Sequence, residues 1–476
     1  MATVLSIDLG TSRVKVGLLD ESLRLLGAAV APYPTARDGS GRAEQRVEDW
    51  LVALGRASRA ARAAAGDPVP DAVVLTAQMP TLVALGDDLE PLGPAVTWQD
   101  GRADALVAAL DASLRARVEA VSGAPLDGRY LVAMERRREA DGEPPAAWLL
   151  SAKDLLFHRL TGSLTTDPST ASGYGLYDLA RGAWSEELIG LWGLDVTTLP
   201  ALAPSAHAET LTAWGAELLG GVRAGAPVVL GGADSVCAHH YVETLFPGAV
   251  SVIDGSSTVV LATLAGPRPP RVLVTPLVQP GALGAEMDLL ATGASIAWLA
   301  ELLGVGAGEL EEMALARSDA ATPTVTFRPY LAGGEQGALW RDDLAGSIEG
   351  LSLTTTRADL ARALYEGIAF ETLRCLRALA PYAPVERVVV LTGPESRSLG
   401  AALLEAAGGL EVWAIGGTSP SLLGAGIVAH SALGVALGVL EAPEPSAPPA
   451  LGDPTALSER LARYLEAPVG AAGEPS

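Results

Sequence analysis

Val4-Leu-Ser-Ile-Asp-Leu-Gly-Thr-Ser-Arg-Val-Lys-Val-Gly-Leu-Leu19 is the stretch of sequence that decides the fold. An apolar run enters a polar turn at Asp8-Leu-Gly-Thr-Ser12, and a second, alternating apolar run follows the turn. Two short runs around a glycine-containing turn predict a β-hairpin. The turn combines a glycine, two hydroxyls and a carboxylate, and Lys15 follows; these groups suit a phosphate and its metal ion. We therefore favour a phosphate-binding hairpin over a purely structural turn.

The same design recurs in the second half of the chain. Residues 249–263 again give an apolar run, an Asp-Gly-hydroxyl turn at Asp254-Gly-Ser-Ser257, and a second apolar run. One such hairpin is weakly informative, because Asp-Gly is a very common hairpin turn. Two of them, one near the start of each half, predict duplicated lobes that face each other across a nucleotide.

Length and composition predict two α/β domains. The chain has 476 residues, of which 49% are hydrophobic and 19% charged, so a large core is available. Apolar strand-like runs alternate with helical patterns in both halves, for example a strand at 72–77 after a helix at 47–64. We expect an N-terminal domain at 1–243, a C-terminal domain at 244–440, and a Pro/Ala-rich tail at 441–476. Three further elements are predicted, a helix at 357–379, a strand at 388–392 and a tail helix at 454–465.

Charge and cysteine content exclude some classes of protein. The net charge of −23 argues against a nucleic-acid partner, although local glycine loops and a metal can still bind an anionic nucleotide. Cys237 and Cys375 are too far apart for a disulfide framework and are expected to be buried thiols. The start of the chain does not resemble a signal peptide, and 424–440 is expected to be a helix packed on a sheet rather than a membrane span. We therefore expect a cytoplasmic protein without a membrane partner, and a solvated helix face at Arg136-Arg-Arg138.

Asp234 is the first candidate for chemistry. It follows a predicted strand and the glycine turn Gly231-Gly-Ala233. A carboxylate rigidly held at the carboxyl end of a strand is well placed for a catalytic base. The same residue would also serve as the N-cap of the helix that follows. Its position alone favours neither interpretation.

Two polar loops suggest a ligand rich in hydroxyl groups. Gln78-Met-Pro80 follows the strand that ends at Ala77, and Trp98-Gln-Asp-Gly-Arg102 lies in a second loop. Amide, carboxylate, guanidinium and aromatic groups together suit directional hydrogen bonding to such a ligand. Taken alone, these residues favour the structural alternative, in which Asp100 caps a helix and Trp98 belongs to the core.

These motifs, in this order, resemble the FGGY carbohydrate kinase family, and its xylulokinase branch most closely, from Val4 to about Gly434. The segments that match in order, besides the two hairpin turns and the loops above, are Glu44-Gln45 with Trp50, Lys153-Asp154, Thr166-Asp167, Leu199-Pro-Ala-Leu202, Gly231-Gly-Ala-Asp234, Pro329-Tyr-Leu-Ala-Gly-Gly-Glu335, Leu364-Tyr-Glu-Gly-Ile-Ala-Phe370 and Ser421-Leu-Leu-Gly-Ala-Gly426. Each segment is weak by itself, but so many in register are specific.

The resemblance implies an α/β protein with the two-lobed actin/hexokinase-like, ribonuclease-H-like fold, whose lobes close on a cleft holding a sugar and ATP. It implies that Asp234 accepts the proton of the attacking hydroxyl. The carboxyl of Asp234 would be ionised at neutral pH if its pKa is near the ordinary value of about 3.9. The resemblance also implies that Asp8 holds Mg²⁺, partly through water. The residues implied to bind ATP are Gly10, Thr11, Ser12, Lys15, Gly255, Ser256, Ser257, Gly393, Ser396 and Gly424. Those implied to bind the sugar are Gln78, Met79, Trp98, Asp100, Arg102 and Asp234. Dimers are frequent among relatives, so a homodimer is a state to test.

The chain departs from the family pattern at several positions. Pro80 stands where xylulokinases usually have a histidine, which removes a hydrogen-bonding side chain from the sugar loop. Gly334-Glu-Gln-Gly-Ala338 replaces the usual Gly-Glu-Arg-Thr-Pro loop, and Gly393-Pro-Glu395 replaces three glycines near the adenosine. Arg13 and Thr258 replace common glycines in the two hairpins.

Three hypotheses follow. The first is an ATP-dependent kinase of a ketose (a pentulose such as xylulose) or a related polyol, with altered specificity. The second, motivated by Pro394 and Glu395, is a catalytically impaired family member that binds a sugar or a nucleotide and acts in regulation. The third, an acetate-kinase-like or actin-like ATPase, is disfavoured by the match of the sugar loops.

Overall fold

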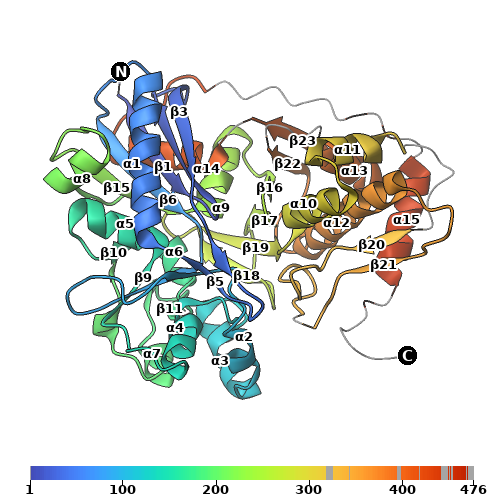
Figure 1. Ribbon diagram of the computed structural model, residues 1–476, viewed down its shortest axis with the longest axis horizontal. Coiled ribbons are helices and arrows are strands. Elements are labelled where there is room, and N and C mark those ends of the chain that lie inside the picture. Colours follow the sequence, from blue (N-terminus) through green and yellow to red (C-terminus); the bar gives the residue numbers. More distant parts are fainter. Residues whose placement is uncertain are drawn as a thin grey trace. The chain divides into compact units, whose positions relative to one another are not determined.

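The computed structural model describes residues 2–317, 325–341, 343–393, 398–417, 419–440, 449, 451, 454–467 and 469. The chain forms two compact units, which we describe separately (Figure 1). Unit 1 comprises Met1–Tyr241, Thr275–Leu283 and Ser419–Glu441, and unit 2 comprises Val242–Val274, Gly284–Thr418 and Ala442–Ser476.

The central sheet of unit 1 has the strand order β14-β15-β6-β1-β2-β3. Its strands are β1 (Val4–Leu9), β2 (Arg13–Leu19), β3 (Leu25–Pro32), β6 (Ala72–Ala77), β14 (Ala208–Thr210) and β15 (Pro227–Ala233). The first three form antiparallel pairs, which confirms the predicted hairpin, whereas β6 runs parallel to both β1 and β15. Strands β1 and β6 are buried throughout, as expected for parallel strands covered on both faces.

Alternating side chains of these strands pack into two layers. Leu5, Ile7 and Leu9 face a core shared with α1 (Val47–Ala64), which is the predicted helix and lies along this face in Figure 1. Val4 and its neighbours face a second cluster with α9 (Asp234–Leu245) and α14 (Pro420–Ala432). This is the period-2 alternation of a strand covered on both sides.

Helix α14 belongs to unit 1 although it comes late in the sequence. Its small residues let it pack closely: a Cβ added at Gly424 would lie 1.7 Å from the carbonyl oxygen of Cys237. The helix packs on β1, β6 and β15, as predicted for a helix on a sheet. Unit 1 therefore includes residues on both sides of the boundary expected at residue 243.

A smaller sheet with the order β4-β5-β8-β7-β9 carries the polar loops of unit 1. Its strands are β4 (Ala36–Arg37), β5 (Ala43–Gln45), β7 (Thr81–Leu85), β8 (Ala95–Thr97) and β9 (Trp148–Ser151). The other elements of this unit are α2 (Asp104–Ala108), α3 (Ala112–Ser122), α4 (Leu131–Ala140), α5 (Ala152–Thr161), β10 (Thr165–Thr166), α6 (Pro168–Ser172), β11 (Tyr177–Asp178), β12 (Ala183–Trp184), α7 (Glu186–Leu191), the 3₁₀-helix at Val196–Thr198, β13 (Ala201–Leu202) and α8 (Ala213–Leu218).

The second six-stranded sheet has the order β18-β19-β17-β16-β22-β23. Its strands are β16 (Val250–Asp254), β17 (Thr258–Thr263), β18 (Leu273–Pro276), β19 (Leu283–Leu289), β22 (Arg387–Thr392) and β23 (Glu411–Gly416). Strand β16 pairs antiparallel with β17 and parallel with β22, which repeats how β1 pairs with β2 and β6. The predicted duplication of the hairpin unit is thus visible in the strand pairing.

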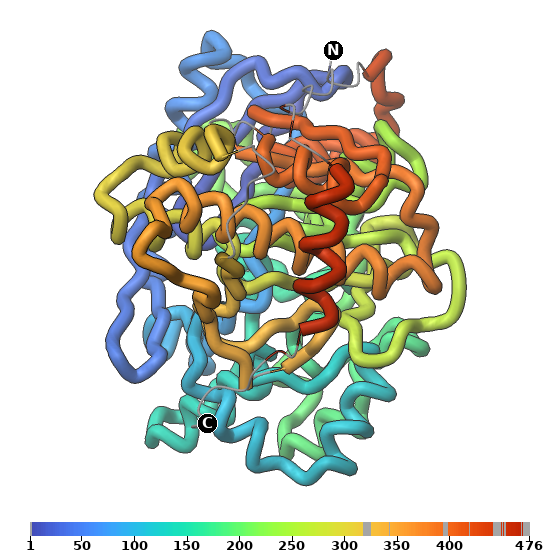
Figure 2. Tube along the Cα trace, turned by 90° about the vertical axis from the view of Figure 1, so that its right-hand side faces the viewer, coloured from blue at the N-terminus to red at the C-terminus, as the bar shows by residue number. Residues whose placement is uncertain are grey.

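Helices of unit 2 cover this sheet, and the tail helix joins them. They are α10 (Thr292–Leu303), α11 (Ala307–Leu315), α12 (Arg357–Leu379), α13 (Leu399–Gly408) and α15 (Pro454–Glu466), with β20 (Thr326–Arg328) and β21 (Ser347–Glu349) forming a separate hairpin. Figure 2 shows α15 in dark red beside the orange helices. It buries Leu457, Leu461 and Tyr464 in the core of unit 2, so this part of the expected tail is a packed helix.

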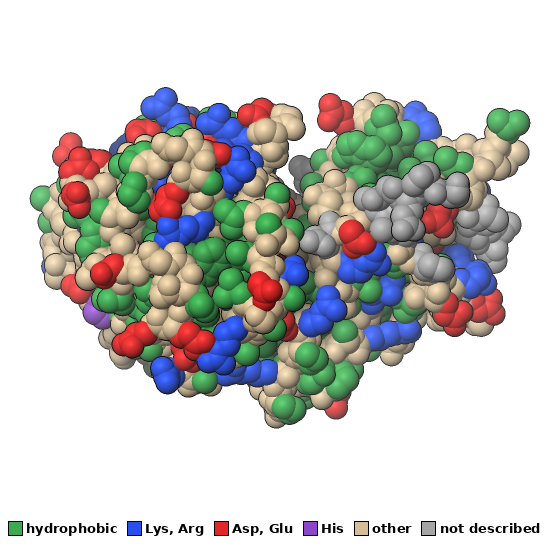
Figure 3. All heavy atoms as spheres, turned by 90° about the horizontal axis from the view of Figure 1, so that it is seen from below, with side chains coloured by type: hydrophobic (Ala, Val, Ile, Leu, Met, Phe, Trp, Pro, Cys, Tyr) green, Lys and Arg blue, Asp and Glu red, His purple; other side chains and the backbone are tan. Residues whose placement is uncertain are grey.

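Two surface properties complete the fold. Among the described residues, each helix is too short or too polar to cross a membrane. On the face drawn in Figure 3, basic and acidic side chains are interspersed rather than gathered into one basic patch.

Candidate functional site

The turn between β1 and β2 brings a carboxylate and an ammonium group together. Asp8 and Lys15 are direct partners across the antiparallel pair. Lys15 Nζ lies 3.1 Å from Asp8 Oδ2, which also accepts a hydrogen bond of 2.7 Å from Ser421 Oγ of α14. The charge of Asp8 raises the pKa of Lys15. Asp8 is 2% exposed, and its Oδ1 has no hydrogen-bond partner among the described residues.

Asp234 follows β15 and opens α9, at the same edge of the sheet as Asp8. The pairing of β15 with β6 contains a bulge between Val229 and Gly232. Gly231 sits in it with φ +68°, and a Cβ there would lie 1.7 Å from the carbonyl oxygen of Leu75. Only glycine fits this position without a shift of backbone.

The pKa of Asp234 differs from the ordinary value that we expected. Burial and, after it, the negative charge of Asp8 raise the pKa of Asp234 to about 7, although the N–H of Ser235 and the charge of Lys15 lower it in part. The Ser235 N–H donates to Asp234 Oδ1 at 2.9 Å. The carboxyl therefore titrates near neutral pH in the ligand-free protein.

A buried polar network supports the turn before Asp234. The N–H of Ala233 donates to Ser169 Oγ at 3.0 Å, and Ser169 in turn donates to Asp167. Asp167 forms an ion pair with the fully buried Lys153, 3.1 Å away. Sequence reasoning placed Lys153 and Asp167 by motif order only and missed Ser169. The available signal was Asp167-Pro168, an N-cap followed by proline at the first helical position.

The two predicted sugar loops meet the phosphate turn. Gln78 is 2% exposed; its Nε2 donates to Gln45 Oε1 at 3.0 Å, and its Oε1 has no hydrogen-bond partner among the described residues. Trp98 Nε1 donates to Thr11 Oγ1 at 3.1 Å. Met79 forms a cis peptide bond with Pro80, and a Cβ added at Gly173 would lie 2.9 Å from its Cγ.

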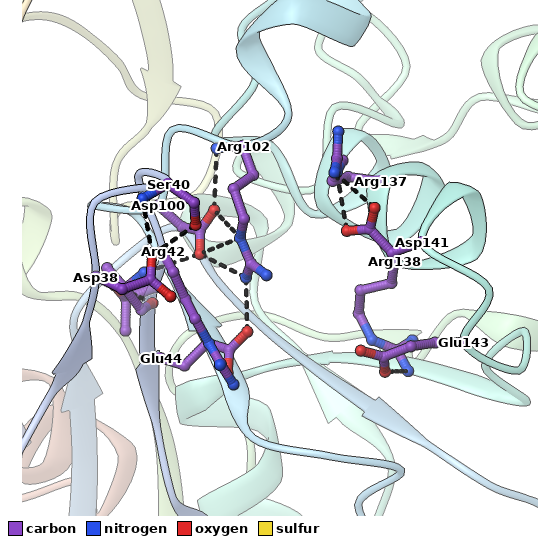
Figure 4. Close-up of polar contacts among 12 residues, drawn as sticks. Asp38, Ser40, Arg42, Glu44, Asp100, Arg102, Arg137, Arg138, Asp141 and Glu143 are labelled. Atoms are coloured by element: carbon purple, nitrogen blue, oxygen red, sulfur yellow. Dashed lines mark hydrogen bonds and ion pairs between the residues drawn. The ribbon is translucent and has the colours of Figure 1, made fainter.

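Asp100 and Arg102 hold each other. Arg102 Nη2 lies 2.6 Å from both Asp100 Oδ2 and Glu44 Oε1, and Asp100 also accepts the N–H of Ala43 at 2.9 Å (Figure 4). Hydrogen bonds to the two carboxylates raise the pKa of Arg102. If either side chain also contacted a substrate, the atoms making that contact would be ones that already take part in these hydrogen bonds.

The arginine run on α4 is less exposed than expected. Arg138 is 6% exposed and pairs with Glu135 at 2.6 Å. It also pairs with Glu143 at 2.8 Å, while Arg137 pairs with Asp141 (Figure 4). The expectation of a solvated face is therefore wrong for Arg138, because acidic side chains one helical turn away and in the next loop compensate its charge.

Unit 2 contains a cavity of about 280 Å³ beside the second hairpin turn. Its lining includes Asp254, Gly255 and Gly393 together with apolar side chains of α10, α12 and β16. Helix α10 begins directly against the turn, since a Cβ added at Gly293 would lie 2.0 Å from the carbonyl oxygen of Gly255. The buried Glu311, also in the lining, accepts the N–H of Leu399 at the start of α13 at 3.0 Å.

The structure brings together most of the predicted residues within each unit. In unit 1 these are Asp8, Gly10, Thr11, Ser12, Lys15, Gln78, Met79, Trp98, Asp100, Arg102 and Asp234, and in unit 2 they are Gly255, Ser256, Ser257 and Gly393. Gly424 lies in unit 1, where its visible contact is packing against Cys237. Pro394, Glu395 and Ser396 lie outside the described residues.

Two models of one protein family match most of the chain. Residues 3–239 match the N-terminal domain of the FGGY family of carbohydrate kinases, and residues 250–433 match its C-terminal domain. The chain is 29% identical over 388 residues to a xylulose kinase of Lactococcus lactis subsp. lactis (strain IL1403), covering 78% of this chain and 75% of the relative. It is 30% identical over 406 residues to a glycerol kinase of Geobacter sp. (strain M21), covering 80% and 79%.

A solved structure extends the likeness to the fold. The crystal structure of a xyloylose kinase from Brucella ovis superposes with a TM-score of 0.84 at 26% identity, covering 97% of this chain and 98% of that one. The predicted α/β fold class is thereby confirmed. With both family domains matched over most of its length, the chain belongs to the FGGY family of carbohydrate kinases.

Proposed function

We propose that this protein transfers the γ-phosphate of ATP to a hydroxyl of a ketose, such as the pentulose xylulose, or of a related polyol, with Asp234 as the base. The observation that carries the proposal is the order of the strands: β1, β6 and β15 are adjacent and parallel, so Asp8 of the phosphate turn and Asp234 after β15 lie at the same edge of the sheet. The charges of Asp8 and Lys15 also act on the pKa of Asp234.

Asp234 has the properties of a general base. A pKa of about 7 lets the group be ionised in much of the protein at neutral pH and still hold a proton after transfer. Because phosphoryl transfer passes through a loose transition state, the main contribution of such a residue is to orient the hydroxyl. The hydrogen bond from Ser235 and the network through Ser169 hold the residue in place for this role.

Asp8 is the residue that would hold Mg²⁺. Its Oδ1 is buried without a hydrogen-bond partner among the described residues, and a hard carboxylate oxygen is a ligand that Mg²⁺ prefers. No group of three or more His, Cys, Asp or Glu side chains in the described part of the chain is arranged for a metal ion. When bound, Mg²⁺ would neutralise part of the phosphate charge. Lys15 would add a second cation at the same turn.

The cavity of unit 2 is the proposed site of the nucleoside. Its volume of about 280 Å³ and its mixed lining of glycines and apolar side chains are close to the smaller end of ligand pockets, roughly 300–1,000 Å³. Gly255 and Gly393 would allow close approach of the nucleotide to the backbone. The Asp254 carboxylate is engaged by Thr258 Oγ1 at 3.0 Å.

The relatives support a small polyhydroxylated acceptor without naming it. Similar curated proteins include xylulose, glycerol and apulose kinases and gluconokinases. Pro80 removes a hydrogen-bonding side chain from one sugar loop, so D-xylulose need not be the best substrate.

The test is ADP release with ATP and Mg²⁺ across a panel of pentuloses, hexuloses, gluconate, glycerol and tetritols. We expect release that depends on one sugar class and is lost in Asp234→Asn, while calorimetry shows the sugar still bound. Full turnover by Asp234→Asn would refute its role as base. Absence of release with every member of the panel would refute the ketose and polyol assignment.

A further inference from the structure

The backbone of the phosphate turn is held by side chains from outside the hairpin. Tyr33 donates its hydroxyl to the carbonyl of Gly10 and its N–H to the carbonyl of Ser12, the latter at 3.2 Å. Gln45 Nε2 donates to the carbonyl of Thr11 at 2.6 Å. Three successive carbonyls of the turn are thus fixed by two residues.

Fixing these carbonyls also fixes the amides that follow them. In a trans peptide the C=O and the next N–H point in opposite directions. The N–H of Thr11 therefore points away from Tyr33, and the N–H of Ser12 points away from Gln45. Backbone N–H groups oriented in this way in a turn form a cradle for an anion.

Gln45 uses every hydrogen-bonding position of its amide. Its Nε2 donates to Thr11 O and to Thr35 Oγ1 at 2.7 Å, and its Oε1 accepts from Trp50 Nε1 and Gln78 Nε2, both at 3.0 Å. It is 2% exposed. An amide hydrogen-bonded on all sides and buried has one allowed orientation.

The chemistry of the partners assigns that orientation. A carbonyl only accepts, so the atom of Gln45 facing Thr11 O is nitrogen; an indole N–H only donates, so the atom facing Trp50 is oxygen. The partner of this oxygen on Gln78 must donate and is therefore its nitrogen. Oε1, the oxygen left over on Gln78, accepts hydrogen bonds and has no partner among the described residues.

We propose that Gln45 is a positioning residue for both substrates: it orients the phosphate turn through Thr11, and it fixes Gln78 so that the acceptor sugar meets a hydrogen-bond acceptor there. The sugar must then present a hydroxyl to Gln78, because a keto or ring oxygen cannot donate. This inference rests on the proposed function and adds to it that Gln78 selects a sugar with a hydroxyl, as hydrogen-bond donor, at this position.

The effect on the turn is tested by binding rather than by turnover. In Gln45→Glu the carboxylate can still accept from Trp50 and Gln78, and the hydroxyl of Thr35 can rotate to donate, but Thr11 O loses its donor. We expect the Kd for Mg·ATP by calorimetry to rise about tenfold or more, as for a lost buried partner, with the sugar Kd changed less than about twofold. Thr35→Val is the matched control, since it removes the other acceptor of the same nitrogen, and its Kd for Mg·ATP should stay within about twofold of wild type.

A second variant guards against misfolding. If Gln45→Glu does not fold by circular dichroism, Tyr33→Phe removes only the hydroxyl that holds Gly10 and should weaken Mg·ATP in the same direction. The positioning role is overturned if the Kd for Mg·ATP is unchanged in Gln45→Glu, or in Tyr33→Phe where that variant replaces it. An equal loss of Mg·ATP affinity in Thr35→Val overturns it as well. These binding results stand even if wild type phosphorylates no sugar in the panel, so failure of the proposed function is recognised separately.

The acceptor role of Gln78 is tested with monodeoxy analogues of the best substrate. One analogue, lacking the hydroxyl that donates to Gln78, should bind wild type at least about tenfold more weakly than the parent. In Gln78→Met the same pair should bind within about threefold of each other, because the acceptor is gone. If no deoxy analogue shows this difference between the two proteins, the assignment of a donor hydroxyl at Gln78 is overturned.

Discussion

Replacing Asp234 by asparagine should flatten the pH dependence of the stability of the ligand-free protein. The pKa of Asp234 is about 7 in the folded protein, against an ordinary 3.8. A carboxyl whose pKa is raised by folding contributes stability that is complete below the unfolded pKa, and this stability is lost as the pH rises through the folded value. Wild type should therefore become less stable, relative to Asp234→Asn, as the pH rises from 5 to 8.

The magnitude follows from the shift. One pKa unit corresponds to about 1.36 kcal/mol, and from pH 5 to a folded pKa near 7 the proton of Asp234 contributes across about two units, or about 2.7 kcal/mol. Above pH 8 this contribution has almost vanished. Asparagine does not titrate, so the difference in free energy of unfolding between the two proteins should change by about 2 to 3 kcal/mol over this range. Glu335, whose pKa burial raises to about 7, is present in both proteins and cancels.

Urea unfolding at pH 5, 6, 7 and 8 measures this difference directly. Asp111→Asn is the control in the same unit: Asp111 caps α3 by accepting the N–H of Ser113, and its hydrogen bonds lower its pKa, so nothing titrates there above pH 5. Its stability should run parallel to wild type from pH 5 to 8. If the free energy of unfolding of Asp234→Asn shows the same pH dependence as that of wild type, the raised pKa and the electrostatic coupling to the phosphate turn are refuted.

Three further predictions, the first with a matched control variant, are each tested by urea unfolding at pH 7. Gly424→Ala should destabilise by about 3 kcal/mol or more or prevent folding, because its Cβ would overlap backbone, whereas Gly190→Ala, with open space around it, should stabilise by about 0.5 to 1 kcal/mol; equal effects would refute the packing role. Asp167→Asn should cost about 3 to 5 kcal/mol, because it leaves the buried ammonium of Lys153 without its nearest partner; a cost below about 1 kcal/mol would contradict this. Tyr464→Ala should cost about 3 to 5 kcal/mol, since its ring is buried in the core of unit 2, and a neutral result would show that α15 is dispensable.

Local patterns in the sequence were enough to predict the hairpins and the long helices. The helices at 47–64 and 357–379 are observed with those bounds, because apolar periodicity and the burial of one face agree. The pairing of Asp8 with Lys15 follows from the hairpin register alone. These features depend on neighbours in the chain, which a single sequence contains.

Features that depend on distant neighbours could not be predicted. Nothing local in Gln45 or Tyr33 indicates that they hold the phosphate turn, since both contacts arise only when β3 and β5 come to lie beside it. The location of α14 was missed for a related reason: a helix that is apolar on every side gives no direction in which to pack. The interaction of Arg102 with both Asp100 and Glu44 could not be predicted either, because Glu44 lies in a strand that is distant in the sequence.

The pKa of Asp234 follows from the topology of the sheet together with one irregularity. Strands β1, β6 and β15 are adjacent, and β6 runs parallel to both of its neighbours, so their carboxyl ends bring Asp8, Gln78 and Asp234 to one edge. The bulge at Gly231 inserts one extra residue before Ala233 pairs with Ala77. Because side chains alternate along a strand, removing that residue would turn the chain before Asp234 to the other face of the sheet. The glycine turn thus sets the side of the sheet on which the carboxylate of Asp234 lies, and with it the burial and the proximity to Asp8 that raise the pKa of this group.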